Sequence, residues 1–352
     1  YSKKNLIHEG IKLFKTSAWK EVYNLSDKKI YKENPGLVVK DKSHLFRILK
    51  YTPLKYEEAS KITRFSIDTI SDLEFFNYVY LLLKKKKLNF EIKNIVKLKN
   101  IIVLNKHVLQ RNPYEKKINI RIITAYGENI GLGHFKRSLV LKREFEERLF
   151  CKVKLYKFKS KSFFKKISVE FNKKDQLTII DLPNKLLKLI QKQISSFKKI
   201  LIVDQLLNNN KFLYLVPNIK LNKKKDFKIY SGLDHLIINR SINFYNLAYS
   251  NINPDIKKLL ILGGAYSIDK EILDFMEHNK DTLKIVIGPL VSMNIINKLK
   301  SQGYSLIINP ENIFELIKRS EKIYSKFGVS VFEIIALKKK PIVFSRFNKK
   351  DK

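Results

Sequence analysis

The chain has 352 residues, of which 44% are hydrophobic and 12% aromatic, so it is long enough for two or three domains with apolar cores. Its 71 Lys and Arg residues against 33 Asp and Glu residues give a net charge of +38, which indicates either polyanionic ligands or a compositional bias. The single cysteine, Cys151, excludes an intramolecular disulfide and a cysteine-based zinc site, and no apolar run reaches membrane-spanning length. We therefore expect a cytoplasmic protein without a transmembrane segment or signal peptide. Because the chain begins at Tyr1 without Met and ends in a polar stretch, we expect a fragment of a longer protein.

The first part of the chain, residues 1–112, is weakly patterned. Residues 65–69 predict a short strand that leads into a helix, and residues 71–83 predict that helix. Residues 91–111 predict one more helix and a tail. Residues 113–117 combine a proline with charged side chains and predict a linker.

After the linker, short apolar runs alternate with helical segments such as residues 135–150. The predicted strands are residues 118–125, 177–180, 200–203, 236–238, 258–262, 283–287, 305–308, 322–325 and 341–344. Two of these strands are followed directly by an aspartate, Asp181 and Asp204. Short apolar strands separated by helices predict parallel sheets covered on both faces, that is, an α/β fold. The count predicts two Rossmann-like lobes, residues 118–252 and residues 256–352.

Glycine is concentrated where this fold binds ligands. The chain has eleven glycines, and seven of them lie at or beside turns that follow predicted strands: Gly127, Gly131, Gly133, Gly263, Gly264, Gly288 and Gly328. Ligands of open α/β sheets bind at the carboxyl ends of the strands. Glycine at such turns indicates close backbone approach or a positive φ angle.

The first glycine motif, residues 126–137, follows a strand and opens a helix. Unpaired N–H groups at a helix start form an anion site. The motif is not a dinucleotide fingerprint, because Lys136 stands at the third glycine position, and it is not a P-loop. A helix N-terminus disfavours imidazolium, so we predict that His134 is a neutral general base. The alternative is a turn with a surface histidine that caps backbone groups.

The second motif, residues 260–267, is a strand that runs into Gly263-Gly264. Backbone N–H groups at such a turn suit a diphosphate. The alternative is an ordinary turn between a strand and a helix, which needs no ligand.

The third motif, residues 325–333, predicts a helix that begins near Val329. This helix places Ser330 beside a ligand and Glu333 one turn further on, where a carboxylate can accept both ribose hydroxyls. The alternative is a capping box formed by Ser330 and Glu333.

The fourth motif lies in the first part of the chain. Asp68, at the end of a predicted strand, is a candidate ligand for Mg²⁺. The alternative, which we favour, is a helix-capping pattern formed by Thr69 and Asp72. The remaining histidines show no metal-ligand spacing.

These motifs resemble a family of sugar-nucleotide enzymes. Residues 131–137 resemble the G-x-G-H-x-x-R signature of the UDP-sugar hydrolase of pseudaminic acid biosynthesis and of the related spore-coat polysaccharide biosynthesis proteins. Residues 230–240 resemble that family's G-x-x-Y-x-x-L-R region, with two substitutions. Residues 262–264 resemble its glycine-rich strand end, and residues 327–333 its nucleotide-binding G-x-[ST]-x-x-E motif. The resemblance covers residues 118–345.

The resemblance implies a GT-B-like fold, related to that of the lipid-II-forming GlcNAc transferase. It also implies that this part of the chain needs no cofactor. UDP is expected on the C-terminal lobe and His134 opposite the sugar, where it activates the water that attacks the anomeric carbon with inversion. The expected substrate-binding residues are Gly131, Gly133, Arg137, Gly263, Gly264, Gly328, Ser330 and Glu333. Two features depart from the family. Val329-Ser330 replaces its commoner Gly/Ser-Thr pair, and its C-terminal lobe continues beyond the strand that matches residues 342–344.

The first part of the chain resembles the tail of cytidylyltransferases that activate acidic sugars. Residues 65–74 carry this resemblance, and residues 104–111 are similar to the end of the spore-coat cytidylyltransferase-like proteins. The resemblance implies that Asp68 binds Mg²⁺ in a complete domain. The glycine-rich CTP-binding start of that fold is not in this chain. We therefore expect residues 1–112 to be a partial α/β nucleotidyltransferase segment without activity of its own.

The resulting expectation is a bacterial enzyme of surface-glycan biosynthesis, of the nonulosonic acid type, that hydrolyses a UDP-sugar. Its expected partners are the UDP-sugar and enzymes of the same pathway, with no specific nucleic acid. A first alternative is a glycosyltransferase with a sugar or lipid acceptor, for which UDP release requires that acceptor. A second is a non-catalytic basic module for nucleic acid or anionic glycan, whose affinity collapses with salt.

Overall fold

The computed structural model describes most of the chain. The described residues are 15–49, 67, 69–91, 94–95, 97–98, 118–127, 130–159, 176–195, 197, 199–207, 209–217, 220–221, 227–249, 252–263 and 270–344. The chain divides into two compact units, residues 1–116 and residues 117–352. Over the described residues, no helix combines the length and apolar character that crossing a membrane requires.

The described part of the first unit is helical. Its elements are α1 (Thr16–Asn24), α2 (Lys29–Glu33), α3 (Pro35–Asp41), the 3-10 helix η1 (Ser43–Leu45) and α5 (Ile70–Lys85). Val22, Tyr31 and Val38 form a small buried core among the first helices. The helix predicted at residues 71–83 is confirmed as α5. The strand predicted at residues 65–69 falls largely outside the described residues, as does most of the segment 91–111.

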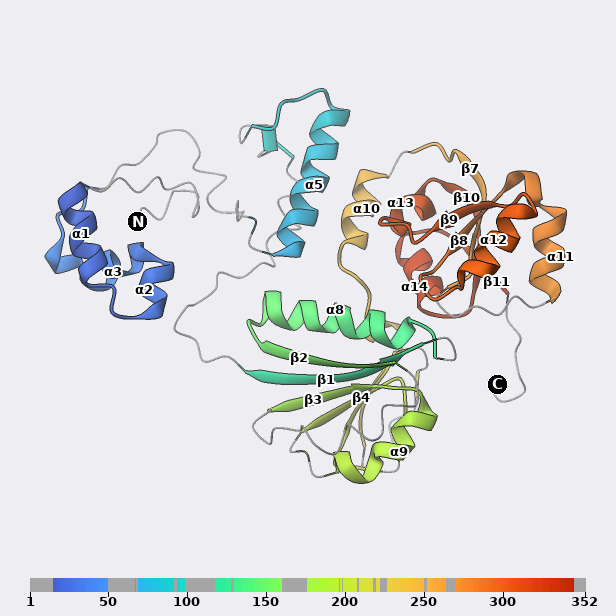
Figure 1. Ribbon diagram of the computed structural model, residues 1–352, viewed down its shortest axis with the longest axis horizontal. Coiled ribbons are helices and arrows are strands. Elements are labelled where there is room, and N and C mark those ends of the chain that lie inside the picture. The colour runs from blue at the N-terminus through green and yellow to red at the C-terminus, as the bar shows by residue number, and fades with distance from the viewer. Residues whose placement is uncertain are drawn as a thin grey trace. The chain divides into compact units, whose positions relative to one another are not determined.

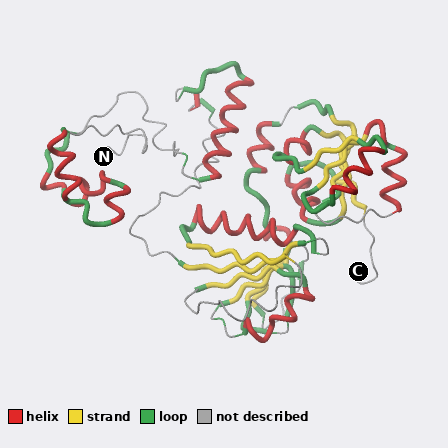
Figure 2. Tube along the Cα trace, viewed as in Figure 1, coloured by secondary structure: helices red, strands yellow, loops and turns green. Residues whose placement is uncertain are grey.

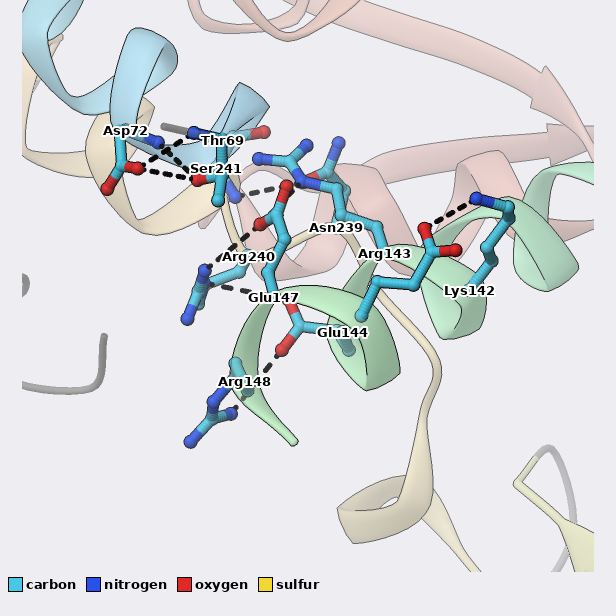
Figure 3. A network of polar contacts seen from close by, with 11 residues as sticks. Thr69, Asp72, Lys142, Arg143, Glu144, Glu147, Arg148, Asn239, Arg240 and Ser241 are labelled. Atoms are coloured by element: carbon cyan, nitrogen blue, oxygen red, sulfur yellow. Dashed lines mark hydrogen bonds and ion pairs between the residues drawn. The ribbon is translucent and has the colours of Figure 1, made fainter. Parts of the chain in front are cut away.

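The start of α5 is a capping box. The hydroxyl of Thr69 accepts the backbone N–H of Asp72 at 3.1 Å, and the carboxylate of Asp72 accepts the N–H of Thr69 at 2.9 Å (Figure 3). Each residue thereby satisfies a backbone donor that the helix itself leaves unpaired. The capping interpretation of this motif is confirmed.

The second unit begins with a sheet of six parallel strands in the order β2-β1-β3-β4-β5-β6. Its strands are β1 (Asn119–Tyr126), β2 (Lys152–Lys159), β3 (Leu177–Asp181), β4 (Ile200–Val203), β5 (Leu213–Val216) and β6 (Lys228–Ser231). The helix α8 (Gly133–Arg148) covers one face and α9 (Asn184–Ile194) the other (Figure 1). Two buried clusters, one on each face, make up the core of this lobe.

One predicted strand of this lobe is wrong. Residues 236–238 follow the 3-10 helix η3 (Leu233–His235) as an extended segment outside the sheet. They are apolar because they pack between elements, with Ile237 against the core of the first lobe and Ile238 against that of the second. The strand of this region is β6, whose residues are half-buried or exposed.

A second sheet of five parallel strands follows in the order β11-β10-β7-β8-β9. Its strands are β7 (Ile256–Ile261), β8 (Leu283–Ile287), β9 (Ser305–Ile308), β10 (Ser320–Lys326) and β11 (Pro341–Phe344). The helices of this lobe are α10 (Ile242–Ala248), α11 (Lys270–His278), α12 (Met293–Ser301), α13 (Ile313–Lys318) and α14 (Val329–Ala336), with the 3-10 helix η4 (Lys280–Thr282). α11 and α12 pack on one face, and α10, α13 and α14 on the other (Figure 2). The predicted α/β class with two Rossmann-like lobes is confirmed.

Each sheet has one place where the strand order reverses. In the first lobe the chain runs from β1 outward to β2 and then returns to place β3 on the other side of β1. In the second lobe it runs from β7 through β8 to β9 and then places β10 on the other side of β7. Open α/β sheets bind ligands at the carboxyl ends of the strands that flank such a reversal. The carboxyl ends of β1 and β3, and those of β7 and β10, are therefore the places to look for a site.

Candidate functional site

A glycine turn connects β1 to α8. The N–H of Gly131 donates to the carbonyl of Gly127 at 2.7 Å, and Gly131 has a φ of 81°, which favours glycine. The turn places the start of α8 beside the carboxyl end of β1. Leu132, at the N-cap, offers no side-chain acceptor to the first N–H groups of α8.

His134, in the first turn of α8, contacts the last residue of β3. Its Nδ1 lies 2.6 Å from Oδ1 of Asp181, whose side chain is fully buried, while 16% of the His134 side chain is exposed. Nη2 of Arg137 lies 3.1 Å from the same Nδ1, and the donor and acceptor roles at this atom depend on the tautomer of the ring. In the tautomer with the proton on Nδ1, the ring donates to the carboxylate of Asp181 and keeps a lone pair on Nε2. The alternative of a surface histidine that caps backbone groups is wrong. The arrangement is that of a histidine base oriented by a carboxylate.

Arg137, one turn further along α8, holds the same aspartate. Its Nε and Nη2 donate to the two oxygens of Asp181 at 3.0 and 2.7 Å, and its Nη1 donates to Oδ2 of Asp204 at 2.8 Å. The Arg137 side chain is only 8% exposed. Burial lowers the pKa of Arg137, but the charges and hydrogen bonds of the two carboxylates outweigh it and raise the pKa above its ordinary value. A direct contact of Arg137 with substrate stays a prediction.

Asp204, the residue after β4, completes this charged cluster. Its φ of 66° lies in the left-handed region, which aspartate tolerates better than most residues. Its N–H donates to the carbonyl of Leu215 at 2.7 Å, and its side chain is 21% exposed. The sequence showed Asp181 and Asp204 only as residues that follow two strands, and it assigned them no role.

In the second lobe, the candidate site consists mainly of backbone. Gly263, after β7, has a φ of 77°, which supports the prediction that this turn needs glycine. Gly264 lies outside the described residues. Gly328 forms the N-cap of α14 with an extended φ, so its conformation does not require glycine.

The other two predicted residues of this lobe lie in α14. Ser330 is the second residue of the helix and not its N-cap, and no side chain caps the helix start. The capping-box alternative for Ser330 and Glu333 is therefore wrong. Glu333 is half-buried, and burial raises its pKa, while the positive charge of Lys136 opposes the shift.

The starts of α8 and α14 lie next to each other. A Cβ atom on Gly133 would lie 3.6 Å from Cγ2 of Val329, an ordinary van der Waals distance. The space around position 133 would therefore accommodate a Cβ atom, so packing does not require glycine there. The charge of Lys136, in α8, also acts on Glu333, in α14. The structure thus brings the first and third sequence motifs together.

Arg240, from the second stretch of resemblance, lies elsewhere. Its Nε is 3.6 Å from Oε1 of Glu144 and its Nη2 is 3.9 Å from Oε2 of Glu147 (Figure 3). These contacts attach the segment after β6 to the later turns of α8. In this structure Arg240 supports the scaffold and is not part of the His134 cluster.

The predicted Mg²⁺ ligand, Asp68, and residues 104–111 lie outside the described residues. Among the residues that the structure does describe, no group of three or more His, Cys, Asp and Glu side chains is arranged to hold a metal ion. Comparison of the chain with known protein families and with curated protein sequences found no match. The function must therefore be inferred from the site and from the short motifs.

Proposed function

We propose that the second unit binds a UDP-sugar and hydrolyses the bond between its anomeric carbon and the diphosphate. The observation that carries this proposal is the contact of His134 with the buried Asp181 at the strand-order reversal of the first sheet. In the tautomer that donates from Nδ1 to Asp181, Nε2 of His134 is a proton acceptor at the edge where α/β sheets bind ligands.

The diphosphate has a favourable environment at the adjacent starts of α8 and α14. The N-cap residues Leu132 and Gly328 contribute no side-chain cap, which favours binding of an anion by the N–H groups at both starts. Gly133 and Val329 lie close together, so both starts can serve one ligand. We expect Glu333, one turn into α14, to accept the ribose hydroxyls, as the resemblance implies.

In the proposed reaction, Nε2 of His134 takes a proton from water. The water oxygen forms a bond to the anomeric carbon, and the bond from that carbon to the diphosphate oxygen breaks. UDP leaves with the electron pair, and attack from the opposite face inverts the anomeric centre. Asp181 stabilises the positive charge that develops on the imidazole.

The sugar itself is proposed from the resemblance alone, as a precursor of a bacterial surface glycan of the nonulosonic acid type. Cytoplasmic partners from the same pathway are part of that proposal. A glycosyltransferase differs only in the acceptor, because the same base can take a proton from a sugar hydroxyl.

The first test is calorimetric titration with UDP, with CMP and CTP as comparison ligands, at moderate and high salt. Binding that prefers UDP and resists salt supports the proposal, whereas binding that ignores the base and disappears with salt supports the basic-module alternative. Glu333→Gln is expected to weaken UDP binding about tenfold, equivalent to ~1.4 kcal/mol.

The second test is turnover of UDP-sugars by the His134→Ala variant. We expect turnover to fall about 100- to 10,000-fold with UDP affinity nearly unchanged. His278→Ala, at an exposed histidine of α11, is the matched control and should keep full activity. Undiminished turnover in His134→Ala removes this residue from the mechanism. Release of UDP that requires an added sugar or lipid acceptor would assign the chain to the glycosyltransferases.

A further inference from the structure

The cluster around His134 contains more than a base and its carboxylate. Arg137 and Asp204 extend it across two neighbouring strands of the first sheet, β3 and β4. We infer that Asp204, acting through Arg137, is a positioning residue that fixes the proton of His134 on Nδ1 and leaves Nε2 free to act as the base. The effect of Asp204 on catalysis rests on the proposed function, whereas its effect on the tautomer of His134 does not.

The geometry of Arg137 is the first argument. An arginine side chain has several rotatable bonds, and a guanidinium held at one side only can turn away from its partner. Here Asp204 holds Nη1, while Nε and Nη2 contact the two oxygens of Asp181. Both edges of the planar group are therefore fixed, and with them both oxygens of Asp181. Oδ1 of Asp181 lies 2.6 Å from Nδ1 of His134, and Nη2 of Arg137 lies 3.1 Å from the same atom, so fixing the carboxylate and the guanidinium fixes the imidazole.

The charge of the cluster is the second argument. Asp204 adds a second negative charge beside Arg137, which favours the positive charge that His134 gains when it accepts a proton. Asp204→Asn removes this charge from a site with little solvent contact. Among the described residues, the charged groups near the start of α8 also include Lys136, which is exposed, and the half-buried Glu333 of α14.

The backbone at Asp204 is the third argument. A φ of 66° lies in the left-handed region, which aspartate and asparagine tolerate better than most residues. Asp204→Asn therefore removes the charge without making the backbone less favourable, so its effect reports on the carboxylate.

The readout that does not depend on substrate is nitrogen NMR of histidine labelled with ¹⁵N. In the wild-type chain, His134 should show a protonated Nδ1 and an unprotonated Nε2, and the signals are assigned by their loss in His134→Gln. In Asp204→Asn we expect a mixture of the two tautomers. Asp234→Asn, at an exposed aspartate of η3, is the matched control and should leave the signals unchanged. A His134 tautomer that does not change in Asp204→Asn, in a variant that unfolds at the wild-type temperature, overturns the inference.

The second readout applies once a substrate is found. Asp204→Asn should lower kcat about tenfold with KM and UDP affinity unchanged, as expected for a displaced catalytic group. Arg137→Lys, which keeps the charge but not the fork of donors, should produce the same tautomer mixture. A variant that raises KM with kcat unchanged would place Asp204 in substrate binding and overturn its positioning role. If the wild type cleaves no UDP-sugar but the tautomer depends on Asp204, the proposed reaction fails while the inference stands.

Discussion

The two lobes of the second unit share a fold but equip their sheet edges differently. In the first lobe, the carboxyl edge at the strand-order reversal carries charged side chains from three elements, α8, β3 and the residue after β4. In the second lobe, the described part of the equivalent edge carries glycine turns at Gly263 and Gly328 and the half-buried carboxyl group of Glu333. Charged side chains suit proton transfer, and backbone N–H groups suit the holding of an anion. The difference supports a division of labour in which the first lobe supplies chemistry and the second supplies binding.

Two buried cations, one in each lobe, have different partners. Arg137 is paired with two carboxylates, whereas Lys318, at the end of α13, donates to the carbonyl of Leu337 at 3.3 Å and to the side-chain carbonyl of Asn246 at 3.4 Å. Leu337 is the C-cap of α14, so Lys318 satisfies the end of a helix at the amino edge of the sheet. A buried cation with carboxylates belongs to the candidate site, and a buried cation with neutral acceptors belongs to the scaffold.

The largest expected effect on stability comes from breaking the ionic cluster of the first lobe. Arg137→Met removes the guanidinium that pairs with both Asp181 and Asp204, and we expect the free energy of unfolding of this unit to fall by about 3–5 kcal/mol. Urea unfolding measures this loss.

The matched control for this experiment is Arg148→Met, on the same helix. Arg148 is 43% exposed and lies 3.4 Å from Glu144, so its removal should cost less than about 0.5 kcal/mol. Equal losses in the two variants would show that the cluster is not a special feature of the first lobe.

The next effect compares the glycine turns of the two lobes. Gly263→Ala places a side chain at a φ of 77°, and we expect it to cost about 1–2 kcal/mol of stability. Gly133→Ala lies at the start of α8, where a Cβ atom would meet its nearest neighbour at an ordinary contact distance. We therefore expect the free energy of unfolding to change by no more than about 0.5 kcal/mol. Thermal unfolding of both variants measures the difference, and a large loss in Gly133→Ala would mean that the two helix starts lie closer than described.

Most of the fold could be predicted because its strands are short apolar runs. Central strands such as β3, β4 and β8 are buried on both faces, and their sequences show it directly. The edge strand β2 was not predicted, because its lysines alternate with apolar residues and interrupt the run. Residues 236–238 misled the prediction for the opposite reason, since they are apolar without belonging to a sheet.

The site could be predicted only in part, because it depends on strand order. The spacing of the first motif was sufficient to single out His134 and the turn at Gly131. Asp181 ends β3 and Asp204 follows β4, and nothing local indicates that β3 returns beside β1. Their proximity to His134 is a long-range consequence of the reversal in strand order. A rule that examines the residue after every predicted strand near a reversal would have found both.

The smallest expected effect concerns the buried cation of the second lobe. Burial, with a further contribution from Lys339 and Lys338, lowers the pKa of Lys318 below its ordinary value of 10.5. Between the lowered pKa and 10.5, the folded state binds fewer protons than the unfolded state, so the free energy of unfolding rises with pH across that window. Below the lowered pKa, the cost of burying the charged amine applies in full. Removing Lys318 should therefore change the pH dependence of the free energy of unfolding more than its value at neutral pH.

Lys318→Met removes both the cost of the buried charge and the hydrogen bonds to Leu337 and Asn246. At neutral pH these effects oppose each other, and we expect the variant to lie within about 1 kcal/mol of the wild type. As the pH rises towards 10.5, the wild type should gain stability relative to the variant, which urea unfolding at several pH values measures. Lys257→Met, at an exposed lysine of β7, should show no such gain. Parallel pH dependence in the wild type and Lys318→Met would mean that the amine of Lys318 stays solvated, and the contrast between the buried cations of the two lobes would then be lost.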